Sequence, residues 1–348
     1  MRAGASATPG VFPQQEHDLA DRYDVLALGN AIVDVIAAHP DSFLGAHGIA
    51  KGMMRLISAD EAELLYRHMG PGREVSGGSA ANTAAGIAAL GGSAAFIGRV
   101  ADDQLGHVFA HDIRAAGVVF QTPPATGGQP TAQCLIVVTP DAQRSMSTFL
   151  GSCREVDEGD VDEEMVRAAG TVYFEGYLWD MPAPIRAVRK AKAIARAAGN
   201  KVAMTLSDVF CVDGHRADFR AMLRDGLVDL VFANEGEAKS LFETDDLQQA
   251  LDGLAACTPL AVVTRSERGA IVVHGRERIE VPAAKPARVL DTTGAGDLFA
   301  AGFLVGHARG LPLRDCAVMG TVAAAEVIEH YGARPEADLK ARMAAALG

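Results

Sequence analysis

The sequence predicts an α/β fold in which helices cover a mostly parallel central sheet. Short apolar runs typical of buried strands recur along the 348 residues, and segments with helical periodicity separate them. Because 49% of the residues are hydrophobic, the chain can bury a large core, as one big domain with an appendage or as two domains. In such folds ligands bind at the carboxyl ends of the parallel strands.

The first strand is expected over residues 23–30, and residues 31–36 continue it. Asp34 lies inside this apolar segment, where a carboxylate is costly to bury unless hydrogen bonds satisfy it. Two interpretations fit this position. Either nearby backbone groups satisfy Asp34 at a strand end, or its carboxylate binds the hydroxyl groups of a sugar.

Two helices are expected next. Residues 58–70 begin with Ser58 and carry Glu61 three residues later, which is the spacing of a capping box. A second helix, rich in alanine, begins near Ser79 directly after two glycines. Close packing explains the alanines but not the diglycine followed by Asn82, a combination that could form a corner for binding hydroxyl groups.

Residues 131–139 and 144–150 form a β-hairpin by their pattern, with a turn at 140–143. Arg144 begins the second strand of this hairpin. It is expected either to reach a transferring phosphate when the hairpin closes over a substrate or to remain a solvated hairpin arginine.

Later strands are expected at residues 171–176, 201–206, 229–233 and 260–264, with helices between them, as in a parallel sheet. The third of these runs into Asn234 and Glu237, which therefore lie where ligands are expected. Acidic residues are also common at helix N-termini without binding a ligand.

A helix that ends near Gly199 is expected to carry five basic residues. Its apolar positions Ile185, Val188 and Ala195 can pack inward, so the basic side chains are expected on a solvated cationic face. These are Arg186, Arg189, Lys190, Lys192 and Arg196.

The most informative stretch is Asp-Thr-Thr-Gly-Ala-Gly-Asp at positions 291–297, between an apolar run and a helix-like segment. Its glycines let a ligand approach the backbone, and the first N–H groups of a helix have no partner within it. With the helix dipole they predict an anion site at Gly294, Ala295 and Gly296. Asp297 lies beside this site as a candidate general base, which indicates phosphoryl transfer. The alternative is a turn that merely caps the helix.

These strings resemble the signatures of the PfkB, or ribokinase-like, family of carbohydrate and nucleoside kinases. Positions 291–297 resemble the second family signature, and the segment from Ser76 to Gly106 resembles the first. Gly-Asn-Ala-Ile-Val-Asp at positions 29–34 is similar to the N-terminal motif of adenosine-kinase-type members. The resemblance covers about residues 22–335, with the motifs in the family order.

The resemblance implies a ribokinase-like three-layer sandwich over residues 22–348, with a small β lid from about residues 36–57 and 119–150. Closure of the lid would exclude water, which competes as phosphoryl acceptor. Asp297 would be the base and residues 294–296 the anion hole. The residues implied to bind the ribose of the substrate are Asn30, Asp34, Gly77, Gly78, Ser79 and Asn82.

The resemblance also implies a site for ATP and Mg²⁺. Asn234 and Glu237 match an Asn-x-x-Glu motif that helps to place magnesium and phosphate, with Glu237 acting through water. A family motif for the nucleotide, Thr-x-Gly-x-x-Gly, is matched by Thr264 and Gly269, but Ser266 replaces its middle glycine. No Walker A string occurs, so phosphate binding depends on the 294–297 loop. A monovalent cation such as K⁺ near Asp291 is implied by family analogy.

Within the family the chain is most similar to bacterial adenosine-kinase-type sequences, which implies phosphorylation of the 5′-hydroxyl of adenosine to AMP. A sugar kinase acting on fructose, ribose or a keto-sugar acid is the alternative on the same fold. A regulator that binds nucleotide or sugar without catalysis is a more distant one. Phe12, Phe43 or Phe149 could stack on a purine or could belong to the core.

Charge and composition exclude other classes. A formal net charge of -12 argues against binding to nucleic acid or anionic membranes, and no apolar run approaches the roughly 20 residues of a membrane span. Five scattered cysteines indicate reduced thiols rather than disulfides or a zinc site. Residues 1–21 lack the apolar core of a signal peptide and are expected to form a flexible tail. A cytoplasmic monomer or homodimer is therefore expected.

Overall fold

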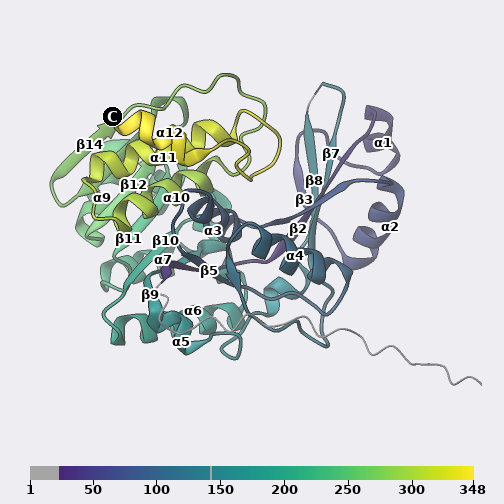
Figure 1. Cartoon of the computed structure of the whole chain (residues 1–348), viewed down its shortest axis with the longest axis horizontal. Helices are drawn as coiled ribbons and strands as arrows, with labels where there is room; N and C mark the ends of the chain where they lie inside the picture. Colours follow the sequence, from purple (N-terminus) through teal and green to yellow (C-terminus); the bar gives the residue numbers. More distant parts are fainter. Residues whose placement is uncertain (1–22, 142) are drawn as a thin grey trace, which may run out of the picture.

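The computed structural model describes residues 23–141 and 143–348 as a large α/β body with a smaller β-sheet beside it (Figure 1). This arrangement confirms the predicted α/β class and its mostly parallel central sheet. Residues 1–22 lie outside the described residues, so the expected N-terminal tail and the interpretation of Phe12 stay predictions.

The large sheet has nine strands in the order β14-β13-β12-β11-β10-β9-β1-β5-β6. Neighbours from β12 to β6 pair in parallel, whereas β13 and β14 extend the other edge in antiparallel fashion. The strands are β1 (Tyr23–Leu28), β5 (Ala94–Ile97), β6 (Val119–Phe120), β9 (Ala169–Glu175), β10 (Lys201–Thr205), β11 (Leu230–Asn234), β12 (Leu260–Thr264), β13 (Ala270–His274) and β14 (Glu277–Val281).

An apolar core covers each face of this sheet. In β1, Val25 and Ala27 belong to one core and Leu26 and Leu28 to the other, since successive side chains of a strand point to opposite faces. Figure 1 shows α11 and α12 on one side of the sheet and α5 and α6 on the other. The molecule is therefore a three-layer sandwich.

Twelve α-helices and three short 3₁₀ helices lie in the described part of the chain. The α-helices are α1 (Asp41–Ala46), α2 (Ala59–Met69), α3 (Ser79–Ala89), α4 (Gln104–Ala115), α5 (Glu163–Ala168), α6 (Pro182–Ala197), α7 (Val209–Arg224), α8 (Glu235–Phe242), α9 (Leu247–Cys257), α10 (Ala295–Ala308), α11 (Leu313–Val327) and α12 (Leu339–Leu347). The 3₁₀ helices are η1 (Gly151–Glu155), η2 (Gly176–Asp180) and η3 (Ser266–Arg268).

The smaller sheet has the strand order β3-β8-β7-β2-β4 and forms the lid. Its strands are β2 (Ile32–Ala38), β3 (Met54–Leu56), β4 (Arg73–Gly77), β7 (Ala132–Val138) and β8 (Arg144–Phe149). The predicted hairpin is confirmed as the antiparallel pair of β7 and β8. Helix α2 packs against both strands, and its predicted capping box between Ser58 and Glu61 is present.

The prediction of one continuous strand over residues 23–36 is wrong. The chain leaves the large sheet after Leu28 and enters the lid sheet only at Ile32. At the break, the N–H of Asn30 donates to Glu175 Oε1 at 2.8 Å, so a buried side chain from a distant segment takes the place of a strand partner there.

The lid also has different limits from those expected. Residues 73–77 belong to it as β4, although they lie outside both expected segments. Residues 119–120, which were expected in the lid, pair with β5 at the edge of the large sheet. The two sheets therefore meet at residues 29–31 and again after residue 77.

Three observations concern membrane spans, metal sites and disulfides in residues 23–141 and 143–348. No helix there is both long and apolar enough to cross a bilayer. No group of three or more His, Cys, Asp or Glu side chains in these residues is arranged to hold a metal ion. All five cysteines are free thiols, and none forms a disulfide.

Candidate active site

The carboxylate of Asp297 lies in the first turn of α10, where two sequence motifs meet. Its Oδ1 accepts a hydrogen bond from Ser79 Oγ at 2.6 Å, and its Oδ2 accepts one from Asn82 Nδ2 at 3.0 Å. Burial raises the pKa of Asp297, while these two bonds and the charge of Arg334 act in the opposite direction. The partners are neutral donors, so the carboxylate is oriented without being neutralised by a direct ion pair.

The loop before Asp297 has the geometry of an anion site. Gly294 is the N-cap of α10 and has φ of 78°, a left-handed conformation that favours glycine. A side chain at this position would also collide with Ala333, whose Cβ lies 2.5 Å from the place of the missing Cβ. The N–H of Ala295 donates to the carbonyl of Thr292 at 3.2 Å. The N–H groups of Gly294 and Gly296 have no acceptor within the described residues.

The diglycine lies directly against the N-terminal motif. A Cβ on Gly78, which has φ of 97°, would lie 2.1 Å from the carbonyl oxygen of Asn30. A Cβ on Gly77 would lie 2.6 Å from Oδ2 of Asp34. Only glycine at both positions lets the two motifs approach this closely. The predicted association of these motifs is thereby present in the fold.

The carboxylate of Asp34 belongs to the same cluster as Asp297. Burial raises the pKa of Asp34 to about 6. The positive charges of Arg334 and Arg144 oppose this shift, and the negative charges of Asp297 and Asp291 reinforce it. The environment of Asp34 is therefore not set by nearby backbone groups alone, because charged side chains from three distant segments act on its carboxylate.

Glu175 is a functional residue that the sequence analysis missed. Its side chain is fully buried at the carboxyl end of β9, and its two oxygens accept the N–H groups of Asn30 and Ala80 at 2.8 Å each. One carboxylate thus fixes both the N-terminal motif and the start of α3. Burial raises the pKa of Glu175 to about 7 despite these bonds. The sequence signal that could have indicated this role is the position of Glu175 at the end of a predicted strand, directly before a glycine.

Arg334 is a second residue that the sequence analysis missed. Its guanidinium donates to the carbonyl of Ser76 through Nη2 at 2.7 Å and to the carbonyl of Ala81 through Nη1 at 2.9 Å. It therefore holds the chain on both sides of the diglycine. Burial lowers the pKa of Arg334 to about 10, and the nearby carboxylates, which include Asp34 and Asp297, oppose that shift.

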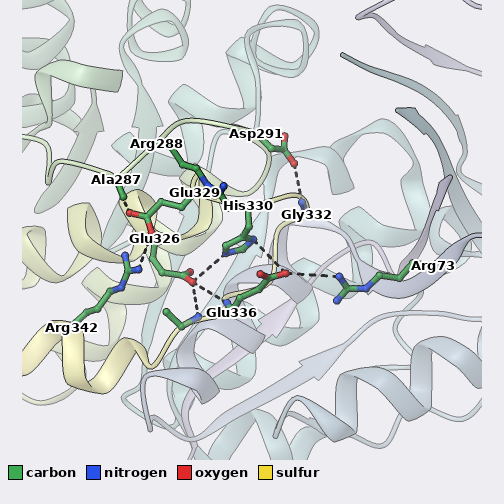
Figure 2. Close-up of polar contacts among 11 residues, drawn as sticks. Arg73, Ala287, Arg288, Asp291, Glu326, Glu329, His330, Gly332, Glu336 and Arg342 are labelled. Carbon is green, nitrogen blue, oxygen red and sulfur yellow. Dashed lines mark hydrogen bonds and ion pairs between the residues drawn. The ribbon is translucent and has the colours of Figure 1, made fainter. Parts of the chain in front are cut away.

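The loop that carries Arg334 is anchored by hydrogen bonds at both ends, as Figure 2 shows. At one end the N–H of Gly332 donates to Oδ2 of Asp291 at 2.9 Å. At the other, buried Glu326 accepts the N–H groups of Glu336 and Ala337 at 2.9 and 2.7 Å. His330 Nε2 lies 3.2 Å from the same Glu326 oxygen. This network fixes the loop against the anion site.

Arg144 is buried rather than solvated, so the interpretation of a solvated hairpin arginine is wrong. Its side chain is 8% exposed and forms an ion pair with Asp291. It also lies 3.4 Å from Thr293 Oγ1 and packs over the ring of Tyr331. Its Nε and Nη2 atoms are buried and have no partner among the described residues. The lid hairpin therefore contacts the anion-site loop through this side chain.

A cavity of about 440 Å³ opens beside these motifs, between the lid and the large sheet. Asn30, Ser79 and Glu175 form its polar end. Its remaining wall is mainly apolar. The apolar residues are Ile32, Met54, Leu56, Leu150, Leu178, Met181, Pro184, Phe210 and Cys211, and Tyr177, Thr148, Arg55, Arg154, Asp180 and Asp208 lie among them. The volume is typical of a site for a small molecule.

Neither Phe43 nor Phe149 lines this cavity. Phe149 is buried in the core, and Phe43 packs against that core and stacks on His39. The aromatic side chains at the cavity are Tyr177 and Phe210, and Phe210 is 88% exposed. A large apolar side chain left this open at the mouth of a cavity is a candidate contact for a ligand.

The expected nucleotide residues lie at the carboxyl ends of neighbouring strands β11 and β12. Asn234 pairs in register with Thr264. Asn234 caps α8 in a reciprocal box with Glu237, whose carboxylate accepts the N–H of Asn234 at 2.9 Å. Glu237 is buried, and burial raises its pKa to about 7. Asn234 and Glu237 therefore form a helix cap, and they lie at the carboxyl edge of the parallel sheet.

Ser266 has φ of 53°, which is a left-handed conformation that costs a serine energy and suits glycine. Gly269 has φ of 84°, and a Cβ there would lie 2.0 Å from the carbonyl oxygen of Val281. The turn therefore has the shape of a glycine motif, although serine occupies its middle position.

Known proteins resemble this chain over most of its length. The pfkB family carbohydrate kinases match it at residues 49–339. The structure is similar to that of adenosine kinase from Sinorhizobium meliloti, with 54% identity, a TM-score of 0.86, and coverage of 93% of this chain and 99% of that one. It is also similar to a probable sugar kinase protein from Rhizobium etli, with 51% identity, a TM-score of 0.87, and coverage of 94% and 99%. Cytidine kinase from Thermococcus kodakarensis is 36% identical over 156 residues, which are 43% of this chain and 54% of that enzyme.

Proposed function

This chain belongs to the pfkB family of carbohydrate kinases and is a phosphotransferase, and we propose that it transfers the γ-phosphoryl group of ATP to the 5′-hydroxyl of adenosine. The products would be AMP and ADP. One observation carries the proposal: Asp297 stands at the N-terminus of α10, and a cavity with a polar and an apolar end opens beside Ser79, its hydrogen-bond partner.

In this reaction Asp297 accepts the proton of the 5′-hydroxyl while the oxygen attacks the γ-phosphorus. The bond between that phosphorus and the β–γ bridging oxygen breaks, and ADP leaves. Because burial raises the pKa of Asp297, it is a stronger proton acceptor than an exposed aspartate. The free N–H groups of Gly294 and Gly296, with Ala295 between them, stabilise the negative charge of the transferred group.

Arg144 is proposed to contribute positive charge to the same step. Two of its three guanidinium nitrogens are buried without partners in the described residues, so they are available to phosphate oxygens. Its ion pair with Asp291 holds it beside the anion-site loop. The same ion pair makes Asp291 a poorer ligand for a monovalent cation, and a K⁺ ion there is the least supported part of the proposal.

The ribose is proposed to bind at the polar end of the cavity. Asp34 and Asn30 supply acceptor and donor groups for its hydroxyls, and Ser79 and Asn82 orient the base Asp297. Gly77 and Gly78 contribute by letting Asp34 and Asn30 lie against the start of α3, where a side chain at either glycine would displace them. The carboxylate of Glu175 acts indirectly, since both of its oxygens already hold backbone N–H groups.

The apolar wall of the cavity favours a nucleoside over a free sugar. A sugar alone would satisfy the polar end but would leave Met181, Phe210 and Leu56 facing water. A purine base in that space would bury apolar surface and could stack on Phe210. The chain is also 51% identical to a probable sugar kinase protein, and sugars are therefore included in the test of the proposed function.

ATP is proposed to bind across the carboxyl ends of β11 and β12, near Asn234, Thr264, Ser266 and Gly269. Mg²⁺ bound with ATP supplies charge neutralisation for the phosphates. The donors fit this ion through water, because Glu237 is buried and its oxygens already accept from Asn234. Magnesium keeps several waters in such sites.

The test is ADP release from Mg-ATP with equal concentrations of adenosine, inosine, guanosine, cytidine, ribose and fructose. Turnover with adenosine far above the others is expected. Turnover with ribose or fructose alone would replace the nucleoside by a sugar while retaining Asp297 as base. If no acceptor supported turnover but ATP or adenosine still bound in calorimetry, the protein would be a non-catalytic regulator.

A further inference from the structure

A second cavity, of about 530 Å³, lies on the far side of η2 from the candidate active site. It is bounded by α6, the end of α7 and Trp179 of η2. Its lining includes three basic residues of one face of α6, Arg189, Lys192 and Arg196, and two acidic ones, Asp218 and Asp225. The positions 189, 192 and 196 are spaced three and four residues apart, so their side chains lie along one stripe of the helix.

Lys192 is the unusual member of this stripe. Only 7% of the residue is exposed, whereas the sequence predicts a solvated lysine. It forms no hydrogen bond or ion pair with any described residue. The aliphatic part of the side chain is buried, whereas Nζ is not enclosed by protein atoms, so the ammonium group reaches the cavity. Neither carboxylate of the lining, Asp218 or Asp225, pairs with it.

The two neighbouring basic side chains, Arg189 and Arg196, add positive charge beside Lys192. Arg189 likewise has no ion pair among the described residues, and Arg196 uses one nitrogen for the carbonyl of Gly226 and lies 3.7 Å from Asp229. Burial, followed by the charges of Arg189 and Arg196, lowers the pKa of Lys192 to about 8. An anion in the cavity would reverse this shift.

We propose that this cavity binds a small phosphate monoester that carries sugar hydroxyl groups. A phosphate monoester brings about two negative charges at neutral pH, which matches two unpaired cations better than the single charge of a carboxylate. The acidic side chains Asp218 and Asp225 disfavour a ligand that is anionic over its whole length, and they accept hydrogen bonds from hydroxyls, so the phosphate is expected beside the basic stripe and the hydroxyls beside the acids. Met222 and Leu227 complete an apolar wall, and the volume suits a metabolite of this size.

The sequence supplies a built-in reporter, because Trp179 is the single tryptophan of the chain and lines this cavity. Ribose 5-phosphate, inorganic phosphate and ribose are titrated while the fluorescence of Trp179 and the melting temperature are followed. The variants are Lys192→Met, which keeps the volume of the side chain and removes its charge, and Arg186→Gln as control. Arg186 lies on the same helix but outside the cavity, where it pairs with exposed Glu158.

Saturable binding of ribose 5-phosphate to the wild type and to Arg186→Gln is expected, with at least about tenfold weaker binding to Lys192→Met. Inorganic phosphate should bind more weakly, and ribose should give no response. Without ligand, Lys192→Met should melt at a higher temperature than the wild type, because it removes a positive charge that burial of the side chain and the charges of Arg189 and Arg196 disfavour.

Equal affinity of the wild type and Lys192→Met would overturn the proposal, since ribose 5-phosphate would then bind elsewhere, such as the candidate active site. Absence of both a fluorescence change and a shift in melting temperature would overturn it as well. A response to ribose alone would show that the charge is irrelevant. These binding and melting measurements do not depend on which acceptor the protein phosphorylates, so this proposal and the proposed function can fail separately.

Discussion

At the scale of single residues, the position of Asp297 is set by neutral hydrogen bonds from Ser79 and Asn82. A base paired with a cation would have a lowered pKa and would accept a proton less readily. In Asp297, burial raises the pKa, and the two hydrogen bonds, which act against that shift, fix the orientation of the carboxylate. Its two partners come from α3, more than two hundred residues earlier in the chain.

Replacement of Asp297 by Asn should lower kcat by about 10² to 10⁴, because it removes the proton acceptor and nearly preserves the shape of the side chain. The KM for the acceptor should change little. Steady-state kinetics measures both values, and circular dichroism establishes that the variant is folded. Asp60→Asn, at an exposed position of α2, is the matched control. Near-native turnover of Asp297→Asn would exclude it as the base.

The buried carboxylates predict how stability depends on pH. Burial raises the pKa of Glu175 from 4.5 to about 7, so the folded state holds its proton over a range in which the unfolded state has lost it. The free energy of unfolding should therefore fall as pH rises from about 4.5 to 7 and level off above that. Denaturant unfolding at several pH values measures this slope.

Glu175→Gln removes that titration and should flatten the slope between pH 5 and 8. Above about pH 7, where Glu175 is ionised, the variant should also be less stable than the wild type, since an amide cannot accept both N–H groups that the carboxylate accepts. Asp34, whose pKa is about 6, contributes part of the slope and remains in the variant. An unchanged slope in Glu175→Gln would show that Glu175 titrates normally.

At the scale of elements, most strands and helices were predictable because their causes are local. The alternation of apolar runs gave β9 to β12, and the spacing of Ser58 and Glu61 gave the start of α2. The motif at 291–297 was recognisable because its glycines and acid lie within one turn. Each of these signals is contained in a window of about ten residues.

The break between β1 and β2, and the roles of Glu175 and Arg334, were not predictable in this way. The hydrogen bonds responsible join residues 145 and 258 positions apart in sequence. No local pattern records which distant backbone group a buried charge will meet. The sequence therefore showed which residues could act and not which segments would hold them in place.

Gly78→Ala tests the close contact between the diglycine and the N-terminal motif. The new methyl group would lie about 2.1 Å from the carbonyl oxygen of Asn30, at a φ that alanine adopts at a cost. A loss of at least about 2 kcal/mol of stability and a higher KM for the acceptor are expected. Thermal unfolding and steady-state kinetics measure the two effects.

Gly127→Ala is the control for this substitution, because a Cβ there would meet nothing within 4 Å. It should change neither stability nor KM by more than the error of measurement. If Gly78→Ala behaved like Gly127→Ala, the two motifs would not be packed as closely as the structure describes.

At the scale of the whole molecule, the lid is attached to the body by short connections and by the contact of Arg144 with Asp291. Hydrogen exchange should therefore slow in the hairpin of β7 and β8 when adenosine and a non-hydrolysable ATP analogue bind together. The buried strand β11 should show little change, because it is already protected. Equal exchange of the hairpin with and without both ligands would argue against closure.

The connection between the two sheets bears on the hydrolysis of ATP in the absence of an acceptor. Residues 29–31 join β1 to β2, and Asn30 within them lines the acceptor cavity and is tied to Glu175. On the proposed function, an acceptor bound at Asn30 would contact the connection between the two sheets, whereas a water molecule would leave most of the cavity unfilled. We therefore expect ADP release from Mg-ATP to be much slower without an acceptor than with adenosine.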